Sequence, residues 1–236
     1  MTRSVGSEAL IDLLGGDVSS CQCEGIELLF DQDAAELNLE EYREVGPAET
    51  TSMLVEALLG EEVLGSTLLD IGGGVGAIQH ALLEAGADRT ISVEASTGYH
   101  EASRKEAERR GLSDRMTHLH GNFVDLAPDI SPADIVALDR VICCFDDMEA
   151  LVSLSAERAK RLYALVYPRD RWWVRIGFAL ENVLRRLQRI PFRTYVHPTE
   201  KVETIVRERG LERRSRRTTW EWQVVVYRRV AAGPAD

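Results

Sequence analysis

The chain has 236 residues, of which 44% are hydrophobic, and this is enough for one substantial α/β domain with additions. No apolar run approaches the roughly 20 residues that a membrane-spanning helix needs, and residues 1–7 lack the apolar core of a secretion signal. The net charge of −11 argues against general nucleic-acid binding. We therefore expect a cytoplasmic protein with no nucleic-acid partner.

The four cysteines form two close pairs, Cys21/Cys23 and Cys143/Cys144. This arrangement is unlike a disulfide framework, and its spacing differs from that of the usual zinc-binding pairs. We expect reduced thiols and no metal site. Cys143 and Cys144 lie in an apolar run, so we expect them to pack in the core.

Charge is distributed unevenly along the chain. From Arg169 to Arg229 there are 16 Lys/Arg against 7 Asp/Glu, although the whole chain is acidic. A basic C-terminal third on an acidic body indicates that one part of the protein faces an anionic partner. The alternative is that these arginines are solvated and pair with the acidic body.

The order of elements predicts a helical cap followed by an alternating α/β core. Short helical candidates cover residues 25–42, and a further helix begins at Gly46-Pro47 and ends at Gly60. Strands are expected at residues 67–71, 90–94, 116–120, 133–138 and 162–167. Helices are expected to follow at residues 77–84, 100–110 and 148–160. Such alternation is typical of a parallel sheet with helices on both faces.

The chain is expected to end in a helix and a β-hairpin. Residues 199–209 have a helical pattern, and two strand-like segments at 213–219 and 222–228 follow with no helix between them. The last strand should therefore run antiparallel to the others. No repeat or low-complexity linker interrupts the chain, so we expect a single domain.

A glycine-rich turn follows the first predicted strand, in the sequence Leu-Leu-Asp-Ile-Gly-Gly-Gly-Val-Gly-Ala at residues 68–77. Strand, glycine turn and helix together form the nucleotide-binding start of a doubly wound sheet. Glycines at such a turn allow a ligand to lie against the backbone, and the helix that follows offers free N–H groups to an anionic end of that ligand.

Two ligand classes compete for this turn. The spacing Gly72-x-Gly74-x-x-Ala77 also fits a dinucleotide fingerprint, which would indicate NAD or FAD. Asp70, just before the turn, would repel a pyrophosphate but suits an ammonium group. Glu94, at the end of the next strand, can bind both hydroxyls of a ribose. The two acids together favour S-adenosylmethionine.

These residues resemble the first two motifs of class I S-adenosylmethionine-dependent methyltransferases. The first is Asp70-x-Gly72-x-Gly74-x-Gly76, and the second is the segment from Val93 to Ser96, followed by Tyr99. His120-Gly121-Asn122-Phe123 resembles the third-strand motif, with Asn122 in place of the usual Asp. A looser likeness to magnesium-protoporphyrin IX methyltransferases and similar small-molecule enzymes rests on the overall layout and on residues 139–144.

The resemblance implies a fold and a set of cofactor-binding residues. The fold is a doubly wound, mostly parallel, seven-stranded Rossmann-like sheet with an antiparallel last strand. A single methyltransferase domain over 1–236 would comprise a helical cap at 1–60, a cofactor-binding core at 61–168, a helical insertion at 169–198, and a closing helix and hairpin at 199–236. The implied cofactor-binding residues are Asp70, Gly72, Gly74, Gly76, Glu94, Ala95, Tyr99, Asn122, Phe123 and Asp139.

The insertion between the fifth strand and residue 199 contains an amphipathic helix. Its apolar stripe consists of Trp173, Ile176, Leu180, Val183 and Leu187, and its basic stripe of Arg171, Arg175, Arg186 and Arg189. Three roles remain open: a lid over the acceptor, a helix on a membrane surface through 169–193, and an ordinary packed helix. As a lid, its apolar stripe would cover the crevice while its arginines reach an anionic acceptor.

The predicted function is methyl transfer from S-adenosylmethionine to a small-molecule acceptor. The chain has no Pro-Cys and no Pro-Pro-Tyr-like segment after the fourth strand, which argues against DNA methylation. Candidate acceptor-binding residues are Tyr167, Trp173, Arg175 and His197, and no catalytic base stands out. The alternatives are an NAD(P)-dependent oxidoreductase and a non-catalytic cofactor-binding protein of the same fold.

Overall fold

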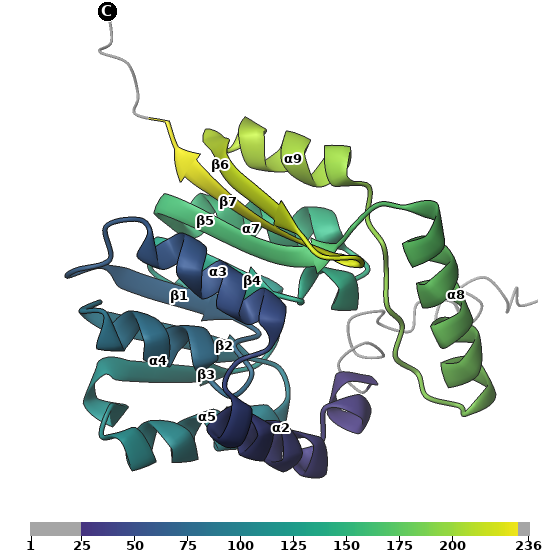
Figure 1. Ribbon diagram of the computed structural model, residues 1–236, viewed down its shortest axis with the longest axis horizontal. Coiled ribbons are helices and arrows are strands. Elements are labelled where there is room, and N and C mark those ends of the chain that lie inside the picture. Colours follow the sequence, from purple (N-terminus) through teal and green to yellow (C-terminus); the bar gives the residue numbers. More distant parts are fainter. Residues whose placement is uncertain (1–24, 231–236) are drawn as a thin grey trace, which may run out of the picture.

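A computed structural model describes residues 25–230 of the chain, and the fold within this range is built on one seven-stranded sheet (Figure 1). The strand order is β3-β2-β1-β4-β5-β7-β6, and β7 runs antiparallel to both of its neighbours. This confirms the predicted fold class. The strands are β1 (Thr67–Ile71), β2 (Arg89–Glu94), β3 (Met116–His120), β4 (Ala133–Asp139), β5 (Ala159–Pro168), β6 (Leu211–Thr218) and β7 (Trp222–Arg229).

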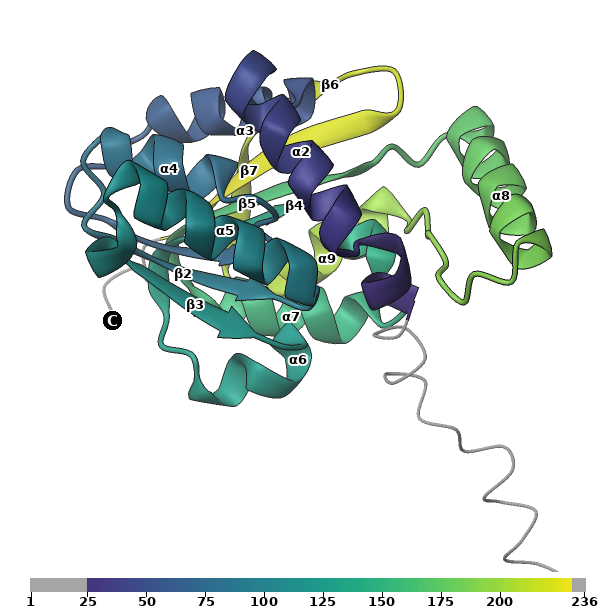
Figure 2. The same cartoon turned by 90° about the horizontal axis from the view of Figure 1, so that it is seen from below.

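Helices cover both faces of the sheet. The helices labelled in Figure 1 are α2 (Gln32–Val45), α3 (Glu49–Leu59), α4 (Ala77–Glu84), α5 (Thr97–Arg110), α7 (Met148–Arg158), α8 (Trp172–Leu187) and α9 (Thr199–Glu208), and α6 (Phe123–Leu126) is labelled in Figure 2. Apolar residues of α3, α4 and α5 pack on one face, and those of α6, α7 and α9 pack on the other. Short 3-10 turns lie at Ser113–Arg115, Ala127–Asp129 and Ile142–Cys144. In contrast to these helices, α8 stands apart from the sheet (Figure 2).

The central strands are buried on both sides, which explains their continuous apolar runs. Successive residues point to opposite faces, so that Leu68 belongs to the cluster under α3 and α4 while Leu69 belongs to the cluster under α7. Both side chains are fully buried. The two cores fix the register of β1 between β2 and β4, and thereby place the ends of these three strands at one edge.

The structure shifts several predicted boundaries for identifiable reasons. The helix expected at 100–110 begins at Thr97, because the Ser96 hydroxyl caps it by accepting from the Tyr99 N–H at 3.1 Å. The helix expected to reach residue 160 ends at Arg158, and β5 starts directly at Ala159. Cys21, Cys23 and the rest of residues 1–24 lie outside the described residues, as do residues 231–236. Within 25–230, no helix is both long and apolar enough to cross a bilayer.

A buried carboxylate attaches the cap helix α2 to α5. The side chain of Glu106 is fully buried and accepts hydrogen bonds from Arg43 of α2 and from Arg109 and Arg110 of its own helix, at 2.6–2.9 Å. These bonds, that from Arg109 above all, hold the pKa of Glu106 well below its usual range. The helices approach closely where they cross, since a Cβ on Gly98 would lie 2.8 Å from the backbone of Asp31.

We predict that Glu106→Gln lowers the free energy of unfolding by about 1.5–3 kcal/mol, the range for hydrogen bonds to a charged group. Because the folded-state pKa of Glu106 is lowered, this stabilisation is present above the unfolded pKa and is lost as the pH falls below about 4.3. Urea unfolding at pH 7 and pH 3 measures the effect, with the exposed Glu108→Gln on the same helix as control. Equal losses for the two variants at pH 7 would contradict the assigned role.

Candidate functional site

A cavity of about 1020 Å³ opens at the carboxyl ends of the central strands. The loops that follow β1, β2, β3 and β4 line it, together with residues of α2, α3 and α8. In open parallel sheets this edge is the usual place for ligands. The volume lies at the upper end of the range for small-molecule pockets, and so leaves room for two ligands side by side.

The glycine turn between β1 and α4 forms part of the cavity wall and depends on backbone that only glycine adopts readily. Gly72, Gly74 and Gly76 have φ of 64°, 55° and 89°. Gly73 was not predicted, yet a Cβ there would lie 2.5 Å from Gln79 Nε2 and 2.6 Å from Asp70 Oδ2. Gly72, Gly73 and Gly74 line the cavity, whereas Gly76 lies behind them at the start of α4.

Asp70 lies under this turn and does not line the cavity. Its side chain is fully buried, and Oδ2 accepts a hydrogen bond of 3.0 Å from Gln79 Nε2. Oδ1 has no hydrogen-bond partner among the described residues. Burial raises the pKa of Asp70 to about 7, and the Gln79 hydrogen bond opposes the shift. Asp70 is thus placed to support the turn from behind, and its free oxygen is a buried acceptor.

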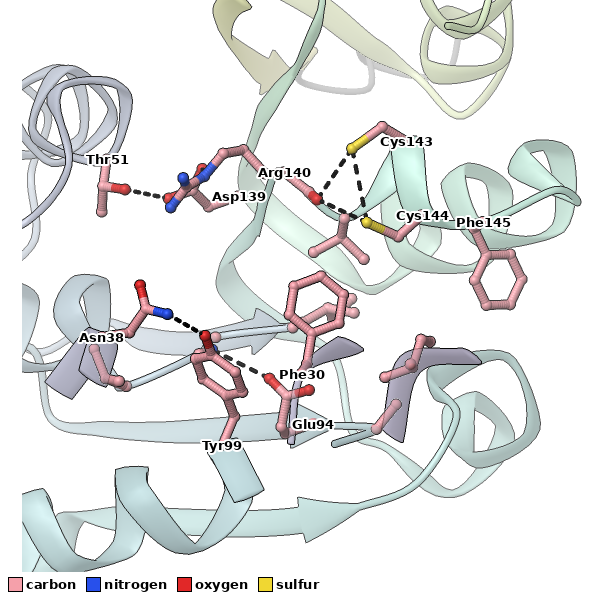
Figure 3. A pocket seen from close by; sticks show the side chains of 18 of the residues that line it. Phe30, Asn38, Thr51, Glu94, Tyr99, Asp139, Arg140, Cys143, Cys144 and Phe145 are labelled. Carbon is pink, nitrogen blue, oxygen red and sulfur yellow. Dashed lines mark hydrogen bonds and ion pairs between the residues drawn. The ribbon is translucent and has the colours of Figure 1, made fainter. Parts of the chain in front are cut away.

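Glu94 joins the end of β2 to the glycine turn (Figure 3). Its Oε2 accepts from the Gly74 N–H at 3.2 Å, and its Oε1 accepts from the Ser96 N–H at 3.0 Å. Burial raises the pKa of Glu94, against the lowering effect of these backbone donors. A carboxylate offers about four lone pairs, so acceptor capacity remains for a ligand, and Glu94 and Ala95 both line the cavity.

Tyr99 forms an aromatic wall with Phe30 and Phe192, and Asn38 is hydrogen-bonded to it; none of these three partners was predicted. The Tyr99 ring lies beside Gly74, and its hydroxyl accepts a hydrogen bond of 2.5 Å from Asn38 Nδ2 of α2. Phe30 packs edge-on against Tyr99, with ring centroids 6.0 Å apart, and edge-on against Phe192, at 5.5 Å. Figure 3 shows Tyr99 beside Glu94, with Asn38 next to the Tyr99 hydroxyl and Phe30 above Glu94.

Asn122 and Phe123 lie where the third-strand motif was expected. Both line the cavity, and each also has a structural task. Asn122 caps α6, since its side-chain oxygen accepts from the Val124 N–H at 3.1 Å. Phe123 is 4% exposed and belongs to the core cluster that includes α7.

Asp139, at the end of β4, is bound by the helical cap. Its Oδ2 accepts a hydrogen bond of 2.5 Å from Thr51 of α3, and its Oδ1 lies 3.3 Å from Arg140 Nε. Arg140 follows with φ of 59°, a left-handed conformation that non-glycine residues seldom adopt and that clusters at functional sites. Figure 3 shows Thr51, Asp139 and Arg140 together on one side of the cavity.

The turn after Arg140 brings Cys143 and Cys144 to the cavity wall. Cys143 is buried, as expected for core packing, but both residues line the cavity. Their sulfur atoms lie 3.2 and 3.4 Å from the Arg140 carbonyl oxygen. His197 holds the outside of this turn, because its Nε2 lies 3.1 Å from the Ile142 carbonyl oxygen and 2.9 Å from that of Phe145.

The structure places the four candidate acceptor-binding residues outside the cavity lining. Tyr167 is 1% exposed in the core, and its burial raises its pKa to about 12. Trp173 packs against Trp220, with ring centroids 5.3 Å apart, and Arg175 pairs with Asp170 at 2.6 Å. His197 supports the 142–145 turn from behind, and its burial lowers its pKa.

The insertion helix faces the cavity with a different side from the one expected. Its lining residues are Phe178, Glu181 and Arg185. Arg185 forms an ion pair of 2.5 Å with Glu181 and lies over the Phe192 ring at 5.2 Å. The expected apolar stripe does not cover the crevice: Leu180 is 66% exposed. The expectation that the apolar stripe covers the crevice was therefore wrong. The face that α8 turns toward the cavity is set by its contacts with residues 192–194, which the periodicity of the sequence does not reveal.

The charge of the cavity is predominantly negative. Eight of its lining residues are acidic and two are basic. The acids are Glu41, Glu49, Glu94, Asp125, Asp139, Asp146, Asp147 and Glu181, and the bases are Arg140 and Arg185. Both arginines pair with acids of the same wall. The lining thus suits cationic or neutral ligands. Within residues 25–230, no group of three or more His, Cys, Asp or Glu is arranged to hold a metal ion.

Comparison with known proteins identifies the central part of the chain. Residues 69–160 match the model of a methyltransferase domain. Ribosomal protein L11 methyltransferase from Photobacterium profundum is 34% identical over 94 residues, which is 39% of this chain and 32% of that protein. The corresponding protein from Edwardsiella ictaluri is 32% identical over 148 residues, which is 60% of this chain and 49% of that protein. The chain thus matches 32% to 49% of the length of these two relatives.

Solved structures extend the likeness to almost the whole fold. Magnesium protoporphyrin IX methyltransferase from Synechocystis PCC 6803, solved with bound S-adenosylhomocysteine, has a TM-score of 0.70 at 17% identity, covering 89% of this chain and 100% of that one. An O-methyltransferase family protein from Burkholderia thailandensis has a TM-score of 0.65 at 17% identity. The likeness covers 96% of this chain and 71% of that one. The family model thus identifies residues 69–160 as a methyltransferase domain. The solved structures show that the described fold is the one that class I S-adenosylmethionine-dependent methyltransferases share.

Proposed function

We propose that the protein transfers a methyl group from S-adenosylmethionine to a small-molecule acceptor that is neutral or cationic where it is bound. The observation that carries the proposal is the arrangement of Glu94 and the glycine turn at one end of a large acidic cavity. Glu94 Oε2 accepts from the Gly74 N–H, so the ribose-binding acid and the turn form one unit. The rest of the cavity remains for an acceptor.

The residues fit the donor in shape and in charge. Gly72, Gly73 and Gly74 would hold the methionine portion, since side chains are absent from this part of the wall. Glu94 would bind the ribose through its remaining lone pairs. Tyr99 and Phe123 would enclose the adenine by stacking, and Asn122 would offer its amide. When bound, S-adenosylmethionine supplies a methyl group on a sulfonium, and the acidic lining complements that positive charge.

Asp139, which the resemblance assigned to the cofactor, would lie between the two ligands. Its carboxylate is 9% exposed and is held by Thr51 of the cap. An acceptor amine or hydroxyl that reaches Asp139 would be oriented by it. The chain's main contribution to the reaction would then be to position the acceptor and exclude water.

The acidic lining bears on the nature of the acceptor. An anionic acceptor was expected from Arg171, Arg175, Arg186 and Arg189, but none of these residues lines the cavity. The two arginines that do, Arg140 and Arg185, are already paired with Asp139 and Glu181. Because neither arginine is left to bind an anion, these pairings favour an amine or a neutral, largely apolar acceptor over a carboxylate. A protein acceptor is the second candidate, because the curated relatives are named ribosomal protein L11 methyltransferases.

Two measurements test this function. Isothermal titration should give micromolar binding of S-adenosylhomocysteine, about −8 kcal/mol at 1 μM, and none of NADH. A screen with methyl-labelled S-adenosylmethionine should then transfer label to small amines or neutral apolar compounds, with carboxylates and ribosomal protein L11 as comparison acceptors. Binding of NADH without S-adenosylhomocysteine would refute the donor assignment. Exclusive labelling of L11 would refute the small-molecule assignment and leave the donor assignment intact.

We predict that Glu94→Ala weakens S-adenosylhomocysteine binding by about 1.5–3 kcal/mol, because it removes hydrogen bonds to a charged group. Glu94→Gln should lose less, since it keeps one oxygen acceptor. Titration calorimetry of both variants measures the change, and Glu108→Ala, on the exposed side of α5, serves as control. If both Glu94 variants bind like the parent, Glu94 does not hold the ribose.

We also predict that Asp70→Asn removes a pH-dependent loss of stability in the ligand-free protein. The raised folded-state pKa of Asp70 means that its stabilisation is complete below the unfolded pKa and is lost as the pH rises through about 7. As the pH rises from 5 to 8, the unfolding free energy of the parent should fall relative to that of Asp70→Asn, by up to about 2 kcal/mol. Urea unfolding at the two values measures it. A difference that is constant with pH would show that Asp70 is not forced to ionise in a buried place.

A further inference from the structure

The insertion helix α8 has two faces with different tasks. One face, with Val174, Phe178 and Arg185, lies against the body of the protein and the cavity. Figure 2 shows α8 projecting from the side of the sheet, so that its other face is directed away from the body.

That outer face is apolar along the entire helix and is exposed. The exposed fractions range from 51% to 77% for the six residues Trp172, Ile176, Leu180, Val183, Leu184 and Leu187. Their spacing of three, four and one places them on one side of a helix of 16 residues, which is about 24 Å long. Single exposed apolar residues are ordinary, whereas a contiguous row of this kind indicates an interaction surface.

Basic side chains border this row. Arg175 and Arg186 are three helical turns apart on the same edge of the row, and both are exposed. Arg171 precedes the helix and Arg189 follows it, so positive charge also flanks both ends. Asp170 pairs with Arg175. Positive charge thus borders one edge and both ends of the row, on a protein whose net charge is −11.

Two tryptophans extend the apolar surface at the start of the helix. Trp172 is 70% exposed. Trp220, in the turn between β6 and β7, is 71% exposed and packs against Trp173, which in turn contacts Trp172. Tryptophan is enriched at the boundary between lipid and water, where one end of its ring is apolar and the other polar.

We propose that the outer face of α8, together with Trp220, docks on the surface of an anionic lipid bilayer. The six apolar side chains would enter the boundary between headgroups and acyl chains, and Arg171, Arg175, Arg186 and Arg189 would bind the lipid phosphates. An exposed apolar face with bordering arginines is the pattern of helices that lie in a membrane interface. The proposal does not depend on which reaction the cavity performs.

A lipid surface fits these residues better than a second copy of the chain does. A stable dimer buries about 800 Å² on each partner, for which one narrow helix face is a small surface, whereas a single amphipathic helix is sufficient for interfacial binding. The bordering arginines would also repel their counterparts in a symmetric pair, but they would attract the negative charge of an anionic leaflet.

Co-sedimentation of the full chain with vesicles tests the proposal. The parent should sediment with vesicles of phosphatidylcholine and phosphatidylglycerol and remain in solution with phosphatidylcholine alone. Raising the salt from about 0.1 M to about 1 M should reduce binding, because screening weakens the arginine contacts. Leu180→Glu/Leu184→Glu should abolish binding, and Arg175→Glu/Arg186→Glu should weaken it by at least about tenfold.

Matched controls carry the same charge changes at exposed sites elsewhere. These are Leu37→Glu/Leu64→Glu for the apolar pair and Arg207→Glu/Arg216→Glu for the basic pair, and both should sediment like the parent. Circular dichroism establishes that each variant is folded. A parent that ignores anionic vesicles would overturn the proposal. So would light scattering that finds a parent dimer which Leu180→Glu/Leu184→Glu converts to a monomer, because the face would then join two copies.

Discussion

The buried carboxylate of Asp70 sets the shape of the glycine turn, and the site is built on that turn. A fully buried acid needs a donor close by, and Gln79 of α4 provides it. The chain can pass over this pair only without a side chain, because a Cβ on Gly73 would meet both of them within 2.6 Å. The turn is thereby held close to the end of β2, where Glu94 accepts the Gly74 N–H.

The helical cap and the insertion complete the cavity wall, the rest of which is formed by the loops at the ends of the strands. Thr51 reaches Asp139 from α3, Asn38 reaches Tyr99 from α2, and Phe192 packs on Phe30. These contacts join segments far apart in the sequence across the mouth of the cavity. Glu106 secures the cap through Arg43, so a buried ion pair some distance from the cavity contributes to its geometry.

The sheet and the glycine turn could be predicted from the sequence because both follow local rules. Glycine spacing, strand ends and alternating elements are readable in short windows, as Gly72–Gly76 and Glu94 illustrate. The aromatic wall could not be found in this way. Phe30 and Asn38 meet Tyr99 only through the packing of α2 on α5, which no local pattern encodes. The helix in the insertion was recognised, but its inward face depends on contacts between Arg185 and the segment around Phe192, and these contacts are tertiary.

The cavity wall is formed only in part by the domain that the family model matches. The glycine turn, Glu94 and Asp139 lie within the matched domain at residues 69–160, whereas Phe30, Asn38, Thr51, Phe178 and Arg185 lie outside it. The shared domain supplies the groups that would bind the donor, which is common to many enzymes. The flanking segments complete the wall around these groups. A change in these flanks would therefore alter the room for an acceptor while the glycine turn and Glu94 stay unchanged.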